Sequence, residues 1–142
     1  GPGGMQVKGA QMLRTRVFDM TCHEQDIRRA VGRPGGTTGP HADIAVEQVL
    51  RAWARRLPGG VGAEGVLEVR VTGRPTVRID LADGAIHRDG SVGEPTATIH
   101  LDVSELLAVA GGRTDAPAAG GIPTDGDRDW AARVLEHATI TP

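Results

Sequence analysis

The chain has 142 residues, with 16 basic and 18 acidic side chains and a formal net charge of −2 at pH 7. This length suits about one domain, and the charge balance argues against a nucleic-acid-binding protein, whose surface carries a basic patch. The 21 glycines and 9 prolines stay just below the share typical of disordered chains. No apolar run approaches the roughly 20 residues of a membrane-spanning helix. The composition therefore excludes collagen, a coiled-coil protein and a membrane protein.

The cysteine count and the first residues bear on where the protein resides. Cys22 is the single cysteine, so no internal disulfide can form, and a reducing cytoplasm is the expected compartment. No stretch has the three-part layout of a signal peptide. Residues 1–4, Gly-Pro-Gly-Gly, resemble the remnant of a protease cleavage. We therefore expect Met5 to be the native start and exclude residues 1–4 from the fold prediction.

Two helices are expected in the first part of the chain. Over 12–32, five apolar residues fall within roughly 80° of one another at 100° per residue, which predicts an amphipathic helix. This apolar stripe consists of Leu13, Val17, Met20, Ile27 and Val31. A second helix is expected over 40–57, because the Pro-Gly-Gly sequence that follows it is a helix stop signal.

The apolar residues change from a helical period to a period of two at residue 65. The Asp83-Gly84 pair predicts a tight hairpin between two of the resulting strands. One apolar and one polar face on each strand are typical of a mostly antiparallel sheet that is covered on one side. The strands are expected over 67–71, 77–81, 85–88 and 97–101.

Helices return after the last predicted strand. They are expected over 103–110 and 127–138, separated by a long loop over 111–125 that is rich in Gly, Pro and Ala. Because helices and strands are segregated along the chain, the predicted fold class is α+β.

Asp19, His23 and Asp26 form the most informative group of polar residues. Asp19 and His23 are four residues apart, so a helix places their side chains on one face, with Asp26 beside them. A carboxylate and an imidazole at this spacing can chelate a divalent cation. The alternative is an ordinary pair on a helix surface. Two ligands make an incomplete site, because catalytic zinc usually has three protein ligands.

Other residues that could carry chemistry also have structural interpretations. Cys22 is predicted to be a small packed thiol rather than a nucleophile, because adjacent helix residues point about 100° apart and His23 therefore faces elsewhere. His87 and His100 are expected on the polar faces of strands, either lining a polar pocket or in contact with solvent. His137, near the end of the last helix, suits an interaction with the helix dipole.

The segment from Phe18 to Ala30, with the string His-Glu-Gln-Asp-Ile-Arg inside it, resembles the last bundle helix of the mycothiol-dependent maleylpyruvate isomerase family. Proteins of that family are similar to DinB-like four-helix metal bundles followed by a domain that resembles sterol carrier proteins. Residues 106–113 and 126–135 are similar to the end of that second domain. The resemblance covers about 130 residues and implies a bundle-type helix over 5–34 and a sterol-carrier-like α+β domain over 41–142.

The same resemblance implies site residues and cofactors. Asp19 and His23 stand where the family has two metal ligands, so the resemblance implies a divalent metal, zinc in the first place, and mycothiol as cofactors. Arg113 stands in the loop from which the second domain contributes an arginine, and a guanidinium can bind a carboxylate substrate with two hydrogen bonds. The alternative for Arg113 is a loop-anchoring role. The family's other histidine ligand comes from an earlier helix, which this chain lacks, and His41 is a candidate substitute.

Three functions follow as hypotheses. The first is a maleylpyruvate-isomerase-like protein, truncated or naturally short, with a partial metal site on its first helix and thiol-dependent chemistry only when the bundle is completed. The second is a non-catalytic, sterol-carrier-like module that binds a small hydrophobic ligand. The third is an interaction protein that forms a homodimer through its first helix, because the apolar stripe would otherwise face water.

Overall fold

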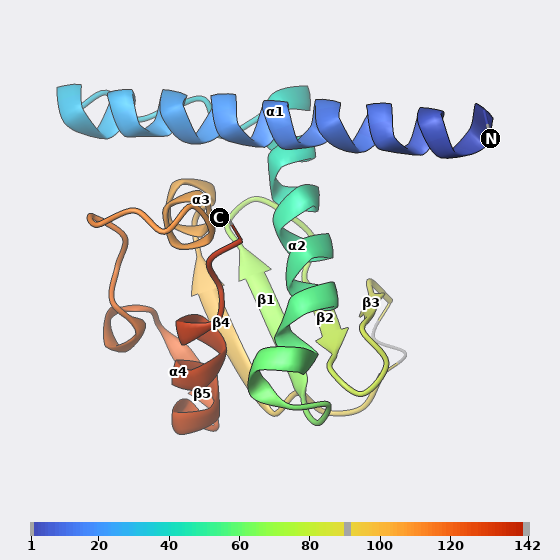
Figure 1. The fold of residues 1–142 in the computed structure, drawn as a ribbon. Helices are drawn as coiled ribbons and strands as arrows, with labels where there is room; N and C mark the ends of the chain where they lie inside the picture. Colours follow the sequence, from blue (N-terminus) through green and yellow to red (C-terminus); the bar gives the residue numbers. More distant parts are fainter. Residues whose placement is uncertain (1, 90–91, 141–142) are drawn as a thin grey trace. The chain divides into compact units, whose positions relative to one another are not determined.

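The computed structural model describes residues 2–89 and 92–140, with side chains from Gly9 onward. The chain divides into two compact units, one up to Gln48 and one from Val49 onward. The first unit contains helix α1 (Pro2–Val31) and the beginning of helix α2 (Pro40–Val61). The second unit contains the rest of α2, the sheet and the remaining helices (Figure 1).

Helix α1 begins at Pro2 rather than near residue 12, where the apolar stripe predicted its start. Proline suits the first turn of a helix, where its missing N–H would have no intrahelical acceptor. The buried residues of α1 are Phe18, Thr21, Cys22 and Gln25. The side chain of Gln25 donates a hydrogen bond to the Gly35 carbonyl at 2.9 Å, which ties the linker after α1 to the helix.

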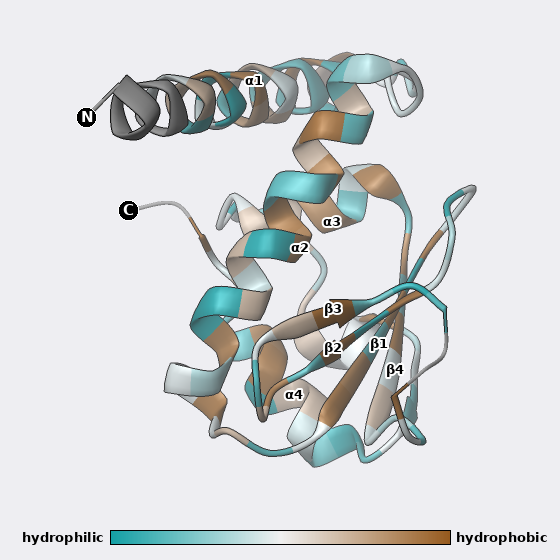
Figure 2. Ribbon diagram, turned by 90° about the vertical axis from the view of Figure 1, so that its right-hand side faces the viewer, coloured by the Kyte–Doolittle hydropathy of each residue, from teal (hydrophilic) through white to brown (hydrophobic). Residues whose placement is uncertain are grey.

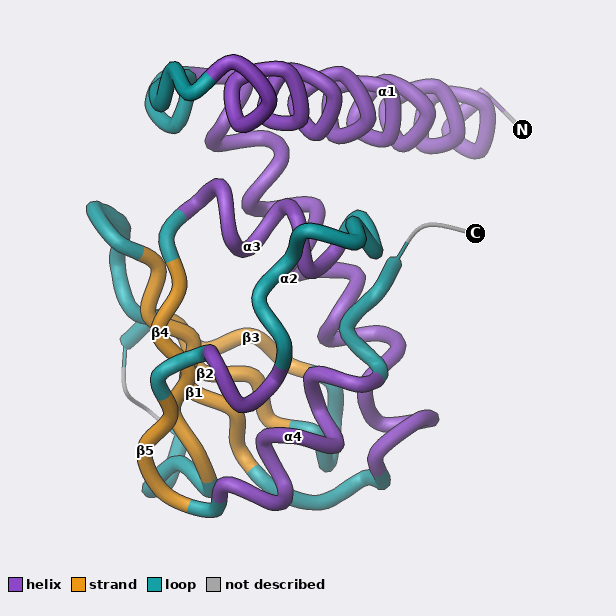
Figure 3. The backbone as a smooth tube through the Cα atoms, turned by 90° about the vertical axis from the view of Figure 1, so that its left-hand side faces the viewer, coloured by secondary structure: helices purple, strands orange, loops and turns teal. Residues whose placement is uncertain are grey.

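The sheet of the second unit has five strands in the order β3-β2-β1-β4-β5 (Figure 3). Three of the four pairings are antiparallel, and the central β1–β4 pairing is parallel. The predicted α+β class with a mostly antiparallel sheet is therefore confirmed. The strands are β1 (Val66–Val71), β2 (Val77–Asp80), β3 (Ala85–His87), β4 (Ala97–Leu101) and β5 (Thr124–Gly126).

One face of this sheet carries the hydrophobic core of the second unit. Alternate residues of the strands, such as Leu67, Ile79 and Ile99, are fully buried, because successive side chains of a strand point to opposite faces. Helix α2 contributes the fully buried Trp53, whose indole N–H donates to the Ala138 carbonyl at 2.8 Å. Figure 1 shows α2 running across the sheet in this unit.

An aspartate caps the N-terminus of each of the two C-terminal helices. Helix α3 (Val103–Ala110) is capped at its N-terminus by Asp102, which forms a capping box with Glu105. Helix α4 (Arg128–Glu136) is capped by the preceding Asp127, whose carboxylate accepts the Trp130 N–H at 3.0 Å. Among the described residues, no helix combines the length and hydropathy that a bilayer-spanning segment requires.

Two sequence expectations about local structure are wrong. Helix α2 does not end before Pro58 but continues to Val61, where the Gly62 N–H still donates to the Pro58 carbonyl at 3.1 Å. The predicted loop over 111–125 contains a short 3₁₀ helix, Ala119–Gly121, and the beginning of strand β5. Strand β5 has almost no apolar alternation, and backbone pairing with β4 defines it instead.

Candidate functional site

Helix α1 exposes one strongly apolar face. Met20 is 62% exposed, whereas Phe18 and Cys22 on the opposite side of the helix are each 3% exposed. Figure 2 shows hydrophobic residues recurring along α1 between hydrophilic ones. At 100° per residue the exposed residues fall within roughly 40° of one another. We call them the α1 apolar face: Leu13 (64% exposed), Met20, Ile27 (64%) and Val31 (60%).

The middle of the α1 apolar face is hollowed. A shallow groove of about 460 Å³ lies on it, lined by Met20, His23, Glu24, Ile27 and Arg28. Arg28 donates to Glu24 Oε1 at 3.1 Å, so an ion pair borders the groove without a net charge. The groove therefore offers an apolar floor between Met20 and Ile27 that an aliphatic or aromatic group could enter.

Asp19 and His23 both lie on the exposed part of α1, one helical turn apart. His23 is 74% exposed, and its Nδ1 atom lies 3.8 Å from Asp26 Oδ2. Asp26 in turn accepts a hydrogen bond from Arg29 at 2.7 Å. Among the residues that the structure describes, no third acidic, cysteine or histidine ligand gathers with Asp19 and His23. They could hold a cation only as part of a larger ligand set, since catalytic zinc usually has three protein ligands.

Three other residues were singled out in the sequence: His41, Arg113 and Cys22. His41 is exposed at the start of α2. Arg113 follows α3, where its guanidinium donates to the Gly111 carbonyl at 3.0 Å and its backbone N–H donates to Ala108. These bonds close the loop after α3, and the substrate role of Arg113 stays a prediction. Cys22 is buried, as expected for a packed thiol.

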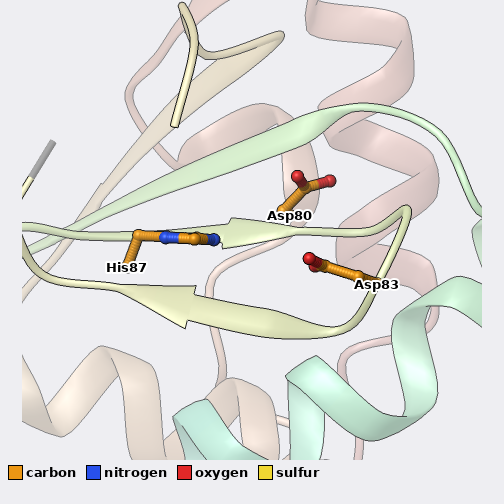
Figure 4. Close-up of side chains that lie close together, drawn as sticks. All are labelled: Asp80, Asp83 and His87. Carbon is orange, nitrogen blue, oxygen red and sulfur yellow. The ribbon is translucent and has the colours of Figure 1, made fainter. Parts of the chain in front are cut away.

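A second group of ligand atoms lies at the β2–β3 hairpin, and sequence spacing did not indicate it. One oxygen of Asp80, one oxygen of Asp83 and one ring nitrogen of His87 all lie within 4.8 Å of one another. Figure 4 shows the Asp83 carboxylate pointing toward the His87 ring. The Oδ1 atoms of Asp80 and Asp83 accept backbone N–H groups of the turn, both at 2.9 Å. We call these three residues the hairpin cluster; two carboxylates and an imidazole are donors that a divalent cation accepts.

The polar face of the sheet is built around Glu68. This side chain on β1 is only 4% exposed, and it accepts hydrogen bonds from Arg78, Arg70 and Thr98. Burial alone would raise the pKa of Glu68, but the hydrogen bonds from Arg78, Arg70 and Thr98 and the positive charge of Arg70 outweigh it, so the pKa lies below its usual value. Glu68 is therefore a structural carboxylate that stays ionised.

The two strand histidines belong to the same polar face. His100 Nε2 lies 2.9 Å from Asp125 Oδ2 on β5, where the pair is partly open to solvent. His87 stands opposite Arg78 in the β2–β3 register. The structure therefore separates the two histidines by two intervening strands, β2 and β1, rather than joining them in one pocket.

A cleft in the second unit lies between α4 and the segment before it. It has a volume of about 380 Å³, and we call it the α4 cleft. Ile122, Pro123 and Ala132 provide apolar surface, and the exposed Arg128 provides a positive charge. Such a lining suits a small ligand with an apolar body and an acidic group.

The chain is similar to known proteins in structure but not in sequence. No family model matches the chain, and no curated protein sequence matches it. The solved structures that are similar to it include sterol carrier protein 2 from Yarrowia lipolytica in its apo form and the UbiJ-SCP2 ubiquinone synthesis protein. The first has 16% identity and a TM-score of 0.49, covering 68% of this chain and 91% of that one. The second has 18% identity and a TM-score of 0.46, covering 66% and 89%.

These values describe a distant likeness in structure. The comparisons give no support to the maleylpyruvate isomerase family. The helices and the five-stranded sheet described above define the α+β architecture.

Proposed function

We propose that the chain is a non-catalytic binding module whose binding surface for an apolar ligand or partner is the α1 apolar face. The observation that carries this proposal is the exposure of Leu13, Met20, Ile27 and Val31, each at least 60%, on one side of one helix. Contiguous exposed apolar surface marks binding sites more often than chance. Burial of one such side chain contributes about 1.5–3 kcal/mol, so four of them support reversible binding.

The groove between Met20 and Ile27 is the expected centre of this surface. Its floor is apolar, and the Glu24–Arg28 ion pair at its border limits how an occupant can lie. Because Met20 is exposed, its replacement by aspartate removes apolar surface and adds a charge without opening a cavity in the core.

Fluorescence of the apolar dye anilinonaphthalenesulfonate tests this proposal at about 1 µM chain, where mass action disfavours self-association. We expect Met20→Asp to weaken dye binding at least fivefold. Met12→Asp is the matched control, because Met12 is 68% exposed but lies off the α1 apolar face. Equal dye binding by all three proteins would contradict the proposal. Loss of binding on Arg128→Glu instead would move the site to the α4 cleft and favour a small-ligand module.

Metal-dependent isomerase chemistry is a separate proposal, supported by the placement of Asp19 and His23 one turn apart on the exposed part of α1. These two residues would hold a divalent cation, zinc first, together with ligands from another helix. The cation would supply Lewis acidity to the thiol of mycothiol. In this chain the role of Asp19 and His23 is to hold the ion, and Arg113 is the proposed substrate clamp.

Competition with a chromophoric zinc chelator tests the metal site. Asp19→Asn and His23→Gln are each expected to lower zinc affinity at least tenfold, whereas His137→Gln, at the end of α4, should not. Unchanged affinity in both α1 variants would contradict the proposal. Loss of zinc on His87→Gln alone would place the ion at the hairpin cluster instead.

A further inference from the structure

The hairpin cluster brings together residues from three places on the β2–β3 hairpin. Asp80 is the last residue of β2, Asp83 lies in the turn, and His87 is the last residue of β3. His87 stands opposite Arg78, and Asp80 follows Arg78 by two residues, so Asp80 and His87 belong to one face of the sheet. One ligand atom of each cluster residue lies within 4.8 Å of the other two. The pairing of β2 and β3 therefore gathers three metal-ligating side chains in one place.

The two carboxylates of the cluster carry like charges at close range. Oδ1 of Asp80 accepts the Ala82 N–H, and Oδ1 of Asp83 accepts the Ala85 N–H, both at 2.9 Å. Within the described part of the chain, no arginine or lysine forms an ion pair with either aspartate. Two negative charges at this separation repel each other, and a cation between them would convert the repulsion into attraction. The two aspartates therefore favour a bound cation.

Arg78, the cation that faces His87 across the strands, is engaged elsewhere. Its Nε donates to Glu68 Oε2 at 2.8 Å, and its Nη1 donates to the Gly93 carbonyl at 3.1 Å. The charge of Arg78 is thus compensated by Glu68 on β1. It does not neutralise the two aspartates of the hairpin cluster.

The imidazole of the cluster provides a second, independent observation. The His87 side chain has other interactions, but its Nε2 atom is buried and forms no hydrogen bond with the described residues. Buried polar atoms are almost always hydrogen-bonded, and an exception calls for an explanation such as a bound ion or water. Figure 4 shows the tip of the His87 ring, which carries Nε2, directed toward the Asp83 carboxylate. The nitrogen is therefore placed where a ligand to the aspartates would meet it.

We propose that the hairpin cluster binds a divalent transition-metal cation of the zinc class through one oxygen of Asp80, one oxygen of Asp83 and Nε2 of His87. A mixed set of imidazole and carboxylate donors suits zinc better than magnesium or calcium, which prefer oxygen ligands alone. Ligand atoms around tetrahedral zinc stand about 3.3 Å apart. The cluster reaches that spacing by side-chain rotation, because Asp83 is exposed. Three protein ligands leave the fourth position to water.

The bound ion would stabilise one edge of the sheet. β3 is a three-residue strand at the end of the strand order, and it pairs only with β2 in the described sheet. The three ligands come together only when β2 and β3 are paired, so the ion binds the folded hairpin and stabilises it by mass action. This inference uses other residues than the α1 apolar face, and it does not depend on the proposed function.

Isothermal titration calorimetry with zinc chloride measures the site in a chain that carries Asp19→Asn and His23→Gln, so that α1 contributes no ligands. We expect one zinc ion per chain. Adding His87→Gln or Asp83→Asn should each lower the affinity at least tenfold. His100→Gln is the matched control, because His100 contacts Asp125 at 2.9 Å on the same sheet without a third ligand, and it should change the affinity less than twofold. No binding at about 1 mM zinc, or equal losses for His87→Gln and His100→Gln, would overturn the inference.

Backbone amide NMR determines where the ion lies. The Ala82 and Ala85 N–H groups donate to the two cluster aspartates, so zinc should shift their signals in the same chain. Zinc binding that leaves both signals unmoved would overturn the inference. Asparagine and glutamine keep a hydrogen-bond acceptor, and circular dichroism without metal checks that each variant folds. If Met20→Asp leaves dye binding unchanged while zinc still binds the hairpin cluster, the proposed function fails and this inference stands.

Discussion

Glu68 and Arg78 occupy facing positions on β1 and β2, and the Arg78 Nε–H donates to Glu68 Oε2 at 2.8 Å. Thr98 faces Glu68 from the other neighbouring strand and donates to its second oxygen at 3.2 Å. One buried carboxylate thus joins the three central strands on the polar face of the sheet. Because Glu68 is nearly fully buried, its ion pair is weakened less by solvent than a surface pair.

Replacement of this carboxylate is expected to destabilise the fold. Glu68→Gln removes the charge that Arg78 and Arg70 bind, so we expect the free energy of unfolding to fall by about 2–3 kcal/mol. Arg70→Gln is the control, since Arg70 is 56% exposed and its pair contributes less than about 1 kcal/mol. Urea unfolding measures both variants. Equal losses in the two would show that Glu68 is not the centre of the network.

Acid should weaken the same network. The pKa of Glu68 lies below its ordinary value of 4.5 in the folded state, so the folded chain holds this carboxylate ionised more strongly than the unfolded chain does. The resulting stability is fully present above pH 4.5 and is lost as pH falls through the lower, folded-state pKa. Urea unfolding between pH 7 and pH 3 should show a steeper loss for the wild-type chain than for Glu68→Gln. Parallel pH profiles would refute this account.

Gly126 is expected to be the least replaceable residue of β5. Its φ is +87°, and a Cβ atom there would lie 2.5 Å from the Thr96 carbonyl oxygen. Gly126→Ala should therefore cost at least about 2 kcal/mol, from the left-handed backbone and the backbone clash together. Gly121→Ala, where a Cβ meets no atom within 4 Å, is the control and should cost far less. Thermal unfolding of both variants provides the measurement.

The indole of Trp53 is expected to fix the end of the chain. Trp53→Phe removes the hydrogen bond to the Ala138 carbonyl and leaves part of the indole volume empty, so we expect a loss of about 2–4 kcal/mol. Because Trp130 is retained, its fluorescence still reports unfolding in denaturant. Hydrogen exchange should also speed up at Ile140, whose backbone N–H donates to Ala110. Unchanged exchange there would show that the C-terminal segment is held without Trp53.

Local patterns in the sequence predicted the fold class well. Residues such as Leu67 and Ile79 alternate with polar neighbours because the sheet is buried on one face, and that alternation is visible without coordinates. The parallel β1–β4 pairing was not visible, because strand order depends on contacts between distant segments. Strand β5 was missed because Thr124–Gly126 has no apolar alternation. The backbone of Thr96 lies so close to Gly126 that there is no room for a Cβ atom, and this contact is visible only in the structure.

The candidate sites also differ in whether a local sequence pattern or the pairing of strands forms them. The exposed stripe of α1 could be predicted, because Leu13, Met20 and Ile27 repeat every seven residues along one helix. The hairpin cluster could not, because Asp80 and His87 meet through the register of β2 and β3 rather than through spacing along one element. In the sequence, Glu68 is an ordinary polar residue of a predicted strand. Its buried network could not be predicted, because strand pairing is what brings Arg78 and Thr98 next to it.

The order of the strands has a consequence for synthesis of the chain. β1 pairs with β2 soon after both leave the ribosome, but its other partner, β4, is made about thirty residues after β1. A nascent chain that ends before Ala97 therefore presents the open edge of β1, with Leu67 and Val69 uncovered. Unpaired strand edges of this kind recruit other chains into aggregates. Translation pauses between residues 80 and 97 would lower the yield of native protein, and C-terminal truncations in this region would collect in inclusion bodies.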